Sequence, residues 1–127
     1  MNEKRVLLAE DDRFLRRACE TSLRKHGFTV LTAVDGEEAL HMARTEVPEL
    51  ILLDLLMPKL SGIEVLEALK EDAGTRNIPI VILSNSSTVL QREKAEALGA
   101  AGYLVKADIS LRELGKHVSK YLEGVTL

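Results

Sequence analysis

The chain has little of what proteins use for covalent cross-links and soft-metal sites. Among its 127 residues are one cysteine, three prolines and no tryptophan, and aromatic residues make up 3 %. The single cysteine, Cys19, excludes an intrachain disulfide and a zinc site made only of cysteines. Any chemistry in this chain therefore has to come from oxygen ligands, lysines and the backbone.

Long apolar segments are also missing. The longest unbroken apolar runs, such as residues 50–53 and 80–83, are far too short to span a bilayer. Met1 is followed by four polar residues and a short strand-like run, which is not the pattern of a signal peptide. We therefore expect no contact with a membrane and a cytoplasmic location.

Neither sign of charge dominates the composition. With 17 basic and 20 acidic side chains the formal net charge is −3, and apolar residues make up 46 %. A mildly acidic chain lacks the basic patch expected of a direct nucleic-acid binder or of a protein that binds anionic membranes. The apolar content argues against disorder, and the length fits one domain. Because no repeat or linker interrupts it, residues 1–127 are expected to form a single domain with no output domain.

Hydrophobic patterning predicts five strands that alternate with five helices. The short apolar runs that predict strands are residues 5–9, 28–33, 50–53, 78–83 and 103–105. Three of the helical segments begin with capping residues, namely Asp35 with Glu38, Ser61 with Glu64, and Ser110 with Glu113. The fourth helix, at about residues 88–98, is expected to turn inward a thin apolar face of Val89, Leu90, Ala97 and Leu98.

This alternation favours a parallel sheet covered by helices on both faces. Because crossover connections are right-handed in nearly all such units, few topologies remain. The expected fold is α/β, a doubly wound five-stranded parallel sheet of strand order 2-1-3-4-5, as in flavodoxin-like (βα)5 domains. In such sheets ligands bind beyond the carboxyl ends of the strands, where the strand order reverses.

Polar residues follow the predicted strands at this edge. Asp11 and Asp12 come after the first strand, and Asp54 comes after the third. Since these two strands are neighbours in the expected order, the three carboxylates should converge. Ser84 ends the fourth strand and Lys106 follows the fifth, so both are expected on the far rim of the same edge.

Converging carboxylates need a compensating charge. Two of them 4 Å apart repel by about 4 kcal/mol at an effective dielectric constant near 20. Either one of them is protonated or a cation lies among them, and oxygen ligands without imidazole or thiolate favour Mg²⁺ or Mn²⁺. Such an ion can hold a phosphoryl oxygen, while Lys106 and Ser84 contact others. Asp54 is then the candidate nucleophile, because aspartyl phosphates are a known type of covalent intermediate.

The motifs at the strand ends also match a known family in order along the chain. They are residues 7–12, residues 53–54 with Met57, Pro58 and Gly62, residues 82–84, and residues 102–106. From end to end the chain resembles the receiver domain of two-component response regulators, the CheY-like family.

The resemblance implies a role for each matching residue. Asp54 would accept a phosphoryl group from the phosphohistidine of a sensor histidine kinase or phosphotransfer protein. Mg²⁺ would be held by Asp11, Asp12, Asp54 and the backbone carbonyl of Leu56. Ser84 and Tyr103 match the pair of residues that change conformation on phosphorylation in this family.

The resemblance also implies partners. The surface made by the fourth helix, fifth strand and fifth helix would contact a downstream protein or output domain. A phosphorylation-dependent homodimer is a further option. The chain would be a phosphoacceptor signalling domain that catalyses only its own phosphorylation and dephosphorylation, and not a turnover enzyme.

Two positions bear on how the site would work. Ala107 follows Lys106 where the family usually has proline, often after a cis bond, and a cis bond before a residue other than proline costs roughly 3–4 kcal/mol. The placement of Lys106 therefore depends on whether this bond is cis or trans. Leu56 is apolar where a polar side chain could orient an attacking water, which predicts a long-lived phosphorylated state.

Three other functions fit these residues less well. A metal-dependent phosphohydrolase of related fold commonly has a second aspartate two residues after its nucleophile, and Leu56 at that position argues against turnover. A flavin-binding module needs a phosphate loop after the first strand, where Asp11 and Asp12 would repel the phosphate. A degenerate receiver, acting as a phosphorylation-independent binding module, is disfavoured by the complete acidic set.

Overall fold

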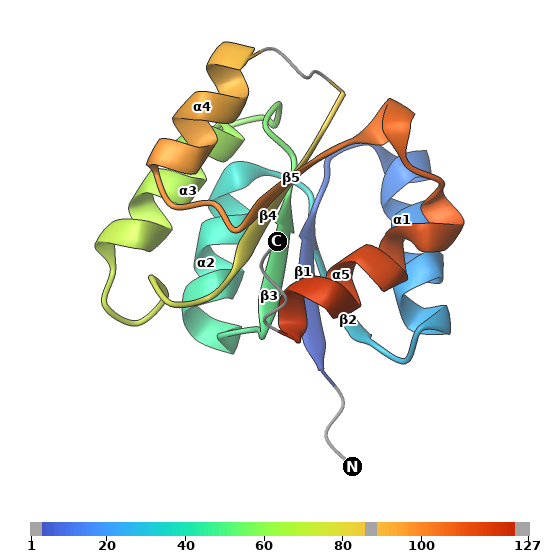
Figure 1. The fold of residues 1–127 in the computed structure, drawn as a ribbon. Coiled ribbons are helices and arrows are strands. Elements are labelled where there is room, and N and C mark those ends of the chain that lie inside the picture. Colours follow the sequence, from blue (N-terminus) through green and yellow to red (C-terminus); the bar gives the residue numbers. More distant parts are fainter. Residues whose placement is uncertain (1–3, 86–88, 124–127) are drawn as a thin grey trace.

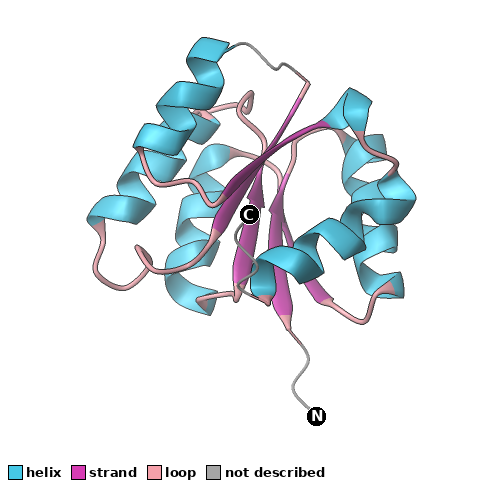
Figure 2. Cartoon of the chain, in the orientation of Figure 1, coloured by secondary structure: helices cyan, strands magenta, loops and turns pink. Residues whose placement is uncertain are grey.

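Five strands and five helices alternate along the chain in the computed structural model, which describes residues 4–85 and 89–123 (Figures 1 and 2). The strands are β1 (Arg5–Ala9), β2 (Thr29–Ala33), β3 (Leu50–Leu53), β4 (Ile80–Ser84) and β5 (Gly102–Val105). The helices are α1 (Arg13–Lys25), α2 (Gly36–Glu46), α3 (Gly62–Glu71), α4 (Val89–Ala97) and α5 (Leu114–Leu122). Two short 3₁₀ turns, η1 (Lys106–Asp108) and η2 (Leu111–Glu113), connect β5 to α5.

The strands form one parallel sheet of order β2-β1-β3-β4-β5, which confirms the predicted topology. All residues of β3 and β4 are buried, as expected for strands covered on both faces. The reversal of strand order falls between β1 and β3, where Ala9 is in register with Leu53. The two strands therefore end at the same level, and the residues after them begin side by side.

Two helix layers cover the sheet, with α1 and α5 on one face and α2, α3 and α4 on the other (Figure 1). On the first face Cys19 and Leu23 of α1 pack with Leu114 and Val118 of α5. Burial raises the pKa of the Cys19 thiol to about 12, so this cysteine is a core residue as expected of an unpaired cysteine on an apolar stripe. Among the described helices, none is long and apolar enough to cross a bilayer.

Capping residues set the beginnings of the helices near the carboxyl edge. The Asp35 side chain accepts a hydrogen bond from the Glu38 amide at 2.8 Å, and Glu38 reaches back to the amide of Val34 at 3.1 Å. Ser61 and Glu64 form the predicted capping box at the start of α3. These caps fix where the loops after β2 and β3 turn into helix.

Two local predictions were wrong. Val89 and Leu90 are 70 % and 76 % exposed and Ala97 is exposed as well, because the face of α4 that packs on the sheet is centred on buried Ala95. Of the predicted inward residues, Leu98 packs against the core. The predicted capping box of Ser110 and Glu113 is absent among the described residues. Instead Ser110 Oγ accepts from the Arg112 amide at 3.2 Å, since residues 111–113 form a 3₁₀ turn and α5 begins only at Leu114. Thr88, the expected first residue of the fourth helix, lies outside the described residues.

Candidate functional site

The carboxyl ends of β1 and β3 bring two acidic residues together. The Asp54 amide donates to the Ala9 carbonyl at 3.1 Å, and the Glu10 amide donates to the Ala33 carbonyl at 3.0 Å, so the ladder continues one step beyond the strands. Glu10 and Asp54 are 1 % and 7 % exposed. Both carboxylates therefore leave the sheet in a nearly buried position.

A cluster of three carboxylates results. Glu10, Asp11 and Asp54 each offer an oxygen, and these oxygens lie within 4.8 Å of one another. Asp11 is exposed, so the cluster is open to solvent on one side. The predicted convergence of Asp11 with Asp54 is confirmed, and we call these three residues the acidic cluster.

Asp12 is placed differently from the prediction. Its carboxylate caps α1 by accepting a hydrogen bond from the Leu15 amide at 3.0 Å, and it is not among the three converging groups. The reason is a count of residues, because β1 ends at Ala9 and the first two residues beyond it are Glu10 and Asp11. Glu10 is thus the residue that the site prediction missed, and the strand boundary was the signal that could have found it.

Lys106 was expected on the far rim of the carboxyl edge, but its side chain extends into the acidic cluster. Its Nζ lies 2.7 Å from Glu10 Oε1 and 3.4 Å from Asp54 Oδ2, and its side chain is 9 % exposed. The residue directly follows β5, and its long side chain extends from that strand toward β1 and β3. No peptide bond between described residues is cis, so the bond from Lys106 to Ala107 is trans.

The pKa values of Glu10 and Lys106 are both raised, but for different reasons. Burial raises the pKa of the Glu10 carboxyl; hydrogen bonds from Lys106 and from the Asp12 amide act in the opposite sense, and the charge of Asp54 adds to the rise. Burial by itself would lower the pKa of Lys106, but its hydrogen bond to Glu10 and the charges of Asp54 and Glu10 outweigh it and raise the pKa. Lys106 is therefore held as a cation beside the acidic cluster.

Ser84 and Leu56 lie at the same edge of the sheet as the acidic cluster. Ser84 ends β4 in register with Val105, so it is one position from Lys106 on the neighbouring strand, and it is 3 % exposed. The Leu56 amide donates to Asp54 Oδ1 at 3.4 Å, while its side chain is 70 % exposed. An apolar and largely open position thus lies next to the Asp54 carboxylate.

Tyr103 lies on β5, in register with Ile82, and is partly buried. The guanidinium carbon of Arg92 on α4 is 5.1 Å from the centre of its ring, within the range of a cation–π contact. The tyrosine is therefore packed on the face of the sheet that α4 covers.

The loop after Asp54 is held closely by α3 and α2. The Gly62 amide donates to the Leu55 carbonyl at 2.9 Å, and a Cβ atom at Gly62 would lie 2.3 Å from the Asp54 carbonyl oxygen. The Gly36 amide donates to the Pro58 carbonyl at 3.2 Å, which ties the loop after β2 to the same segment. These approaches fix the backbone from the Asp54 carbonyl to Pro58.

The donor set fits a hard divalent cation. Lys106 contacts the carboxylates of Glu10 and Asp54, and the Arg16 guanidinium donates to the backbone carbonyls of Glu10 and Asp11 at 3.0 and 3.2 Å. The three carboxylates of the cluster therefore outnumber these two cations, and a net negative charge remains when all are ionised. Oxygen ligands without imidazole or thiolate are those that Mg²⁺ and Mn²⁺ prefer. The arrangement can hold such a cation next to a nearly buried carboxylate that has a lysine on its other side.

Comparison with known proteins gives a consistent family. Residues 6–119 match the model of the response regulator receiver domain. The chain is 42 % identical over 118 residues to the transcriptional regulatory protein PrrA of Mycobacterium bovis, covering 93 % of this chain and 49 % of that protein. It is 38 % identical over 125 residues to the probable transcriptional regulator ycf27 of Porphyridium aerugineum, covering 98 % and 50 %. The chain thus spans about half the length of the curated relatives it matches.

Solved structures agree with this. The receiver domain of the Francisella response regulator 1452 superimposes with a TM-score of 0.87 at 30 % identity, covering 96 % of this chain and 98 % of that one.

Proposed function

Because this chain belongs to the receiver domain family of two-component response regulators, we propose that it is a signalling switch that accepts a phosphoryl group on Asp54. The observation that carries the proposal is the environment of this carboxylate. It is nearly buried, it belongs to the acidic cluster with Glu10 and Asp11, and its Oδ2 lies 3.4 Å from Lys106 Nζ.

The chemistry follows from these groups. An oxygen of Asp54 attacks the phosphorus of a phosphohistidine, the P–N bond breaks, and its electron pair returns to the imidazole, which takes up a proton. The product is an acyl phosphate on Asp54. Lys106 is placed to bind a phosphoryl oxygen as negative charge collects there, and Ser84 offers a hydroxyl next to it. Positioning and neutralisation of charge are most of what phosphoryl transfer requires.

Receiver domains generally bind Mg²⁺ at a cluster of acidic residues, and the acidic cluster fits that role. We propose that Glu10, Asp11 and Asp54 provide its carboxylate ligands, with the backbone carbonyl of Leu56 as a further oxygen. When bound, the ion supplies positive charge that neutralises phosphoryl oxygens. Asp12 then contributes by capping α1 and so fixing the chain just after Asp11.

The proposed partners follow from the two ends of a signalling reaction. The donor is a sensor histidine kinase or a phosphotransfer protein, and the readout is a downstream protein or output domain that contacts α4, β5 and α5. The exposed Val89 and Leu90 of α4 support an interaction there, because they place apolar area in solvent at the beginning of that helix. A phosphorylation-dependent homodimer would use the same surface. The relatives named as transcriptional regulators make control of transcription the output to examine first.

A metal-dependent phosphohydrolase is the alternative that the site has to be tested against. Leu56 has an apolar side chain where an acid–base group would be needed for turnover, which favours a domain that keeps its phosphoryl group. A degenerate receiver is disfavoured because the acidic cluster and Lys106 are both in place. A cytoplasmic location remains a prediction.

Incubation with acetyl phosphate or phosphoramidate and Mg²⁺, followed by intact mass measurement, tests the proposal. We expect the mass of one added phosphoryl group, with none in the presence of EDTA and none in Asp54→Asn. Asp72→Asn is a matched control, because it also replaces a carboxylate by an amide, but at a residue that pairs with Arg44 and does not belong to the acidic cluster. This variant should be labelled normally. No adduct together with no Mg²⁺ binding would support the degenerate receiver, and steady release of phosphate would support the phosphohydrolase.

The lifetime of the adduct is a separate prediction. With Leu56 beside Asp54, the phosphorylated protein should lose phosphate slowly at neutral pH. Leu56→Asn should shorten the lifetime by about tenfold. A general base typically contributes a factor of about 10² or more, and an asparagine amide, which only orients the attacking water, should contribute less. Phosphate release from purified protein, followed with and without the substitution, measures both. Rapid loss from the unsubstituted protein would contradict the prediction.

A further inference from the structure

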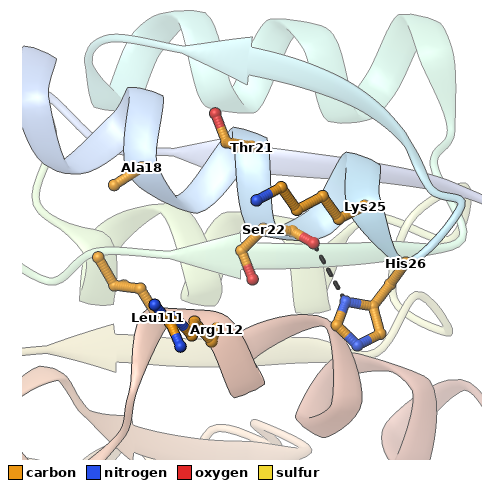
Figure 3. A pocket seen from close by; sticks show the side chains of 7 residues that line it. All are labelled: Ala18, Thr21, Ser22, Lys25, His26, Leu111 and Arg112. Carbon is orange, nitrogen blue, oxygen red and sulfur yellow. Dashed lines mark hydrogen bonds between the residues drawn. The ribbon is translucent and has the colours of Figure 1, made fainter.

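A pocket of about 400 Å³ lies between α1 and the η2 turn, and none of its lining residues belongs to the acidic cluster (Figure 3). Its walls are Ala18, Thr21, Ser22, Lys25 and His26 from α1 and the following residue, with Leu111 and Arg112 from η2. This volume is within the range of pockets that hold small molecules. The pocket is not part of the packing that holds the sheet, because residues of α1 and α5 already pack together on the sheet beneath it.

The charge of the lining has one sign. Lys25 and Arg112 are cationic, and no carboxylate of the described residues lines the pocket, although the chain as a whole has a net charge of −3. Within the described residues neither Lys25 nor Arg112 forms an ion pair, whereas the neighbouring Arg24 is paired with Glu20 at 2.8 Å. Two cations therefore face the same hollow without an anionic partner from the described chain.

Ser22 provides an independent observation. Its side chain is 6 % exposed, and its Oγ is buried without a hydrogen-bond partner in the described part of the chain. In Figure 3 this hydroxyl points from α1 toward the ribbon of the η2 and α5 segment, while the Ser22 carbonyl accepts from His26 Nδ1 at 3.1 Å on the other side. A buried hydroxyl is normally hydrogen-bonded, and leaving it without a partner costs free energy. Less than 1 Å² of the Oγ atom is exposed, so a polar ligand atom in the pocket would provide that partner after the Ser22 side chain rotates toward the hollow.

The rest of the wall is apolar. Ala18 and Leu111 present methyl groups, and the lysine stem adds methylene groups below its charged end. A bare inorganic anion would leave this area uncovered, and a neutral apolar molecule would leave the cations unused. We propose that the pocket binds a small organic anion, with its apolar body against Ala18 and Leu111 and its anionic group between Lys25 and Arg112. The proposal is independent of phosphoryl acceptance at Asp54.

The test uses 2-naphthoate as the probe, added to the ¹⁵N-labelled protein of residues 1–127 and followed by amide chemical shifts. We expect saturable shifts confined to residues 18–26 and 111–115. The neutral isostere 2-naphthalenemethanol should bind about tenfold more weakly, since it lacks the charge-assisted hydrogen bonds. Inorganic phosphate alone should shift these resonances only weakly.

Two sets of variants separate the two parts of the site. The double variant Lys25→Gln with Arg112→Gln should lose the preference for naphthoate over the alcohol. Its matched control, Arg17→Gln with Lys116→Gln, removes the same charges from exposed positions of α1 and α5 and should keep that preference. Ser22→Ala should weaken the binding of naphthoate by about fivefold, the worth of one ordinary hydrogen bond. It should leave the midpoint of thermal unfolding unchanged or higher.

Three results would overturn the proposal. These are no saturable shifts up to millimolar naphthoate, shifts centred on other residues, and equal loss of binding in the control double variant. Phosphate binding as tight as naphthoate would replace it with a simple anion site. Labelling of Asp54 by acetyl phosphate should be the same in both double variants, so failure here is distinguishable from failure of the proposed function.

Discussion

Replacement of Lys106 by methionine is expected to destabilise the Mg²⁺-free protein by about 3 kcal/mol, because it leaves buried carboxylates without their cation. Lys106 Nζ is 2.7 Å from Glu10 Oε1 and 3.4 Å from Asp54 Oδ2, and all three side chains are at most 9 % exposed. Methionine has a side chain of similar volume to lysine but carries no charge. Urea unfolding in EDTA measures the free energy of unfolding.

Two comparisons make this result specific. Glu10→Gln in the Lys106→Met background should recover part of the lost stability, because the buried carboxylate is then removed as well. Lys59→Met is the matched control, since Lys59 is 57 % exposed and pairs with Asp35 and Glu37 only at 3.6 and 3.8 Å. Its effect should be within about 0.5 kcal/mol. An equal loss in both single variants would contradict the role given to Lys106.

The pH dependence of the Lys106→Met deficit has a defined sign. The folded pKa of Lys106 is raised, so its contribution is complete below the ordinary lysine pKa and is lost as pH rises beyond it. The pKa of Glu10 is also raised, and Glu10 therefore takes up a proton early as pH falls. The deficit should be largest near neutral pH and should shrink in acid as Glu10 becomes neutral.

Gly62→Ala is expected to lower stability by about 3 kcal/mol, at the upper end of what overpacking costs. The added Cβ would lie 2.3 Å from the Asp54 carbonyl oxygen and 2.7 Å from the Leu55 Cα, and both are backbone atoms that cannot turn aside. The loop after β3 or the start of α3 has to move. Because the displaced atoms belong to Asp54 and its neighbour, phosphoryl acceptance should also slow.

Gly74→Ala is the control for this substitution. A Cβ at Gly74 would have its nearest neighbour, Asp72 Oδ1, at 3.4 Å, and its effect should stay within about 0.5 kcal/mol. Thermal unfolding and the rate of acetyl phosphate labelling measured on both variants give the comparison. Normal stability and labelling in Gly62→Ala would show that the contact of α3 with Asp54 is not required.

The architecture was predictable because its signals are local and repeated. Fully apolar runs such as residues 50–53 and 80–83 indicate buried parallel strands, and the capping box of Ser61 and Glu64 marks a helix start by residue type alone. Together with the handedness of crossover connections, these signals leave little choice of topology. The inward face of α4 was predicted wrongly because alanine at position 95 carries little hydrophobic signal, while the exposed Val89 and Leu90 carry much.

The site was predictable in composition and less so in geometry. The order of strands brought Asp11, Asp54 and Lys106 to one edge, and the structure confirms that edge. The first strand was predicted with its observed end at Ala9, so the choice between Glu10 and Asp12 depends on the direction in which each side chain leaves the backbone beyond it, which a residue pattern does not resolve. The reach of Lys106 to Glu10 depends on side-chain length and on the path of η1, and neither is visible in a residue pattern.

The central claim is that Asp54 itself carries the phosphoryl group. Borohydride reduces an acyl phosphate to an alcohol with loss of phosphate, and an aspartyl phosphate therefore becomes homoserine. After treatment with acetyl phosphate and Mg²⁺, reduction and digestion, peptide mass spectrometry should find homoserine at position 54, with Glu10, Asp11 and Asp12 intact. Reduction at another carboxylate, or at none while the peptide containing position 54 is fully recovered, would contradict the account.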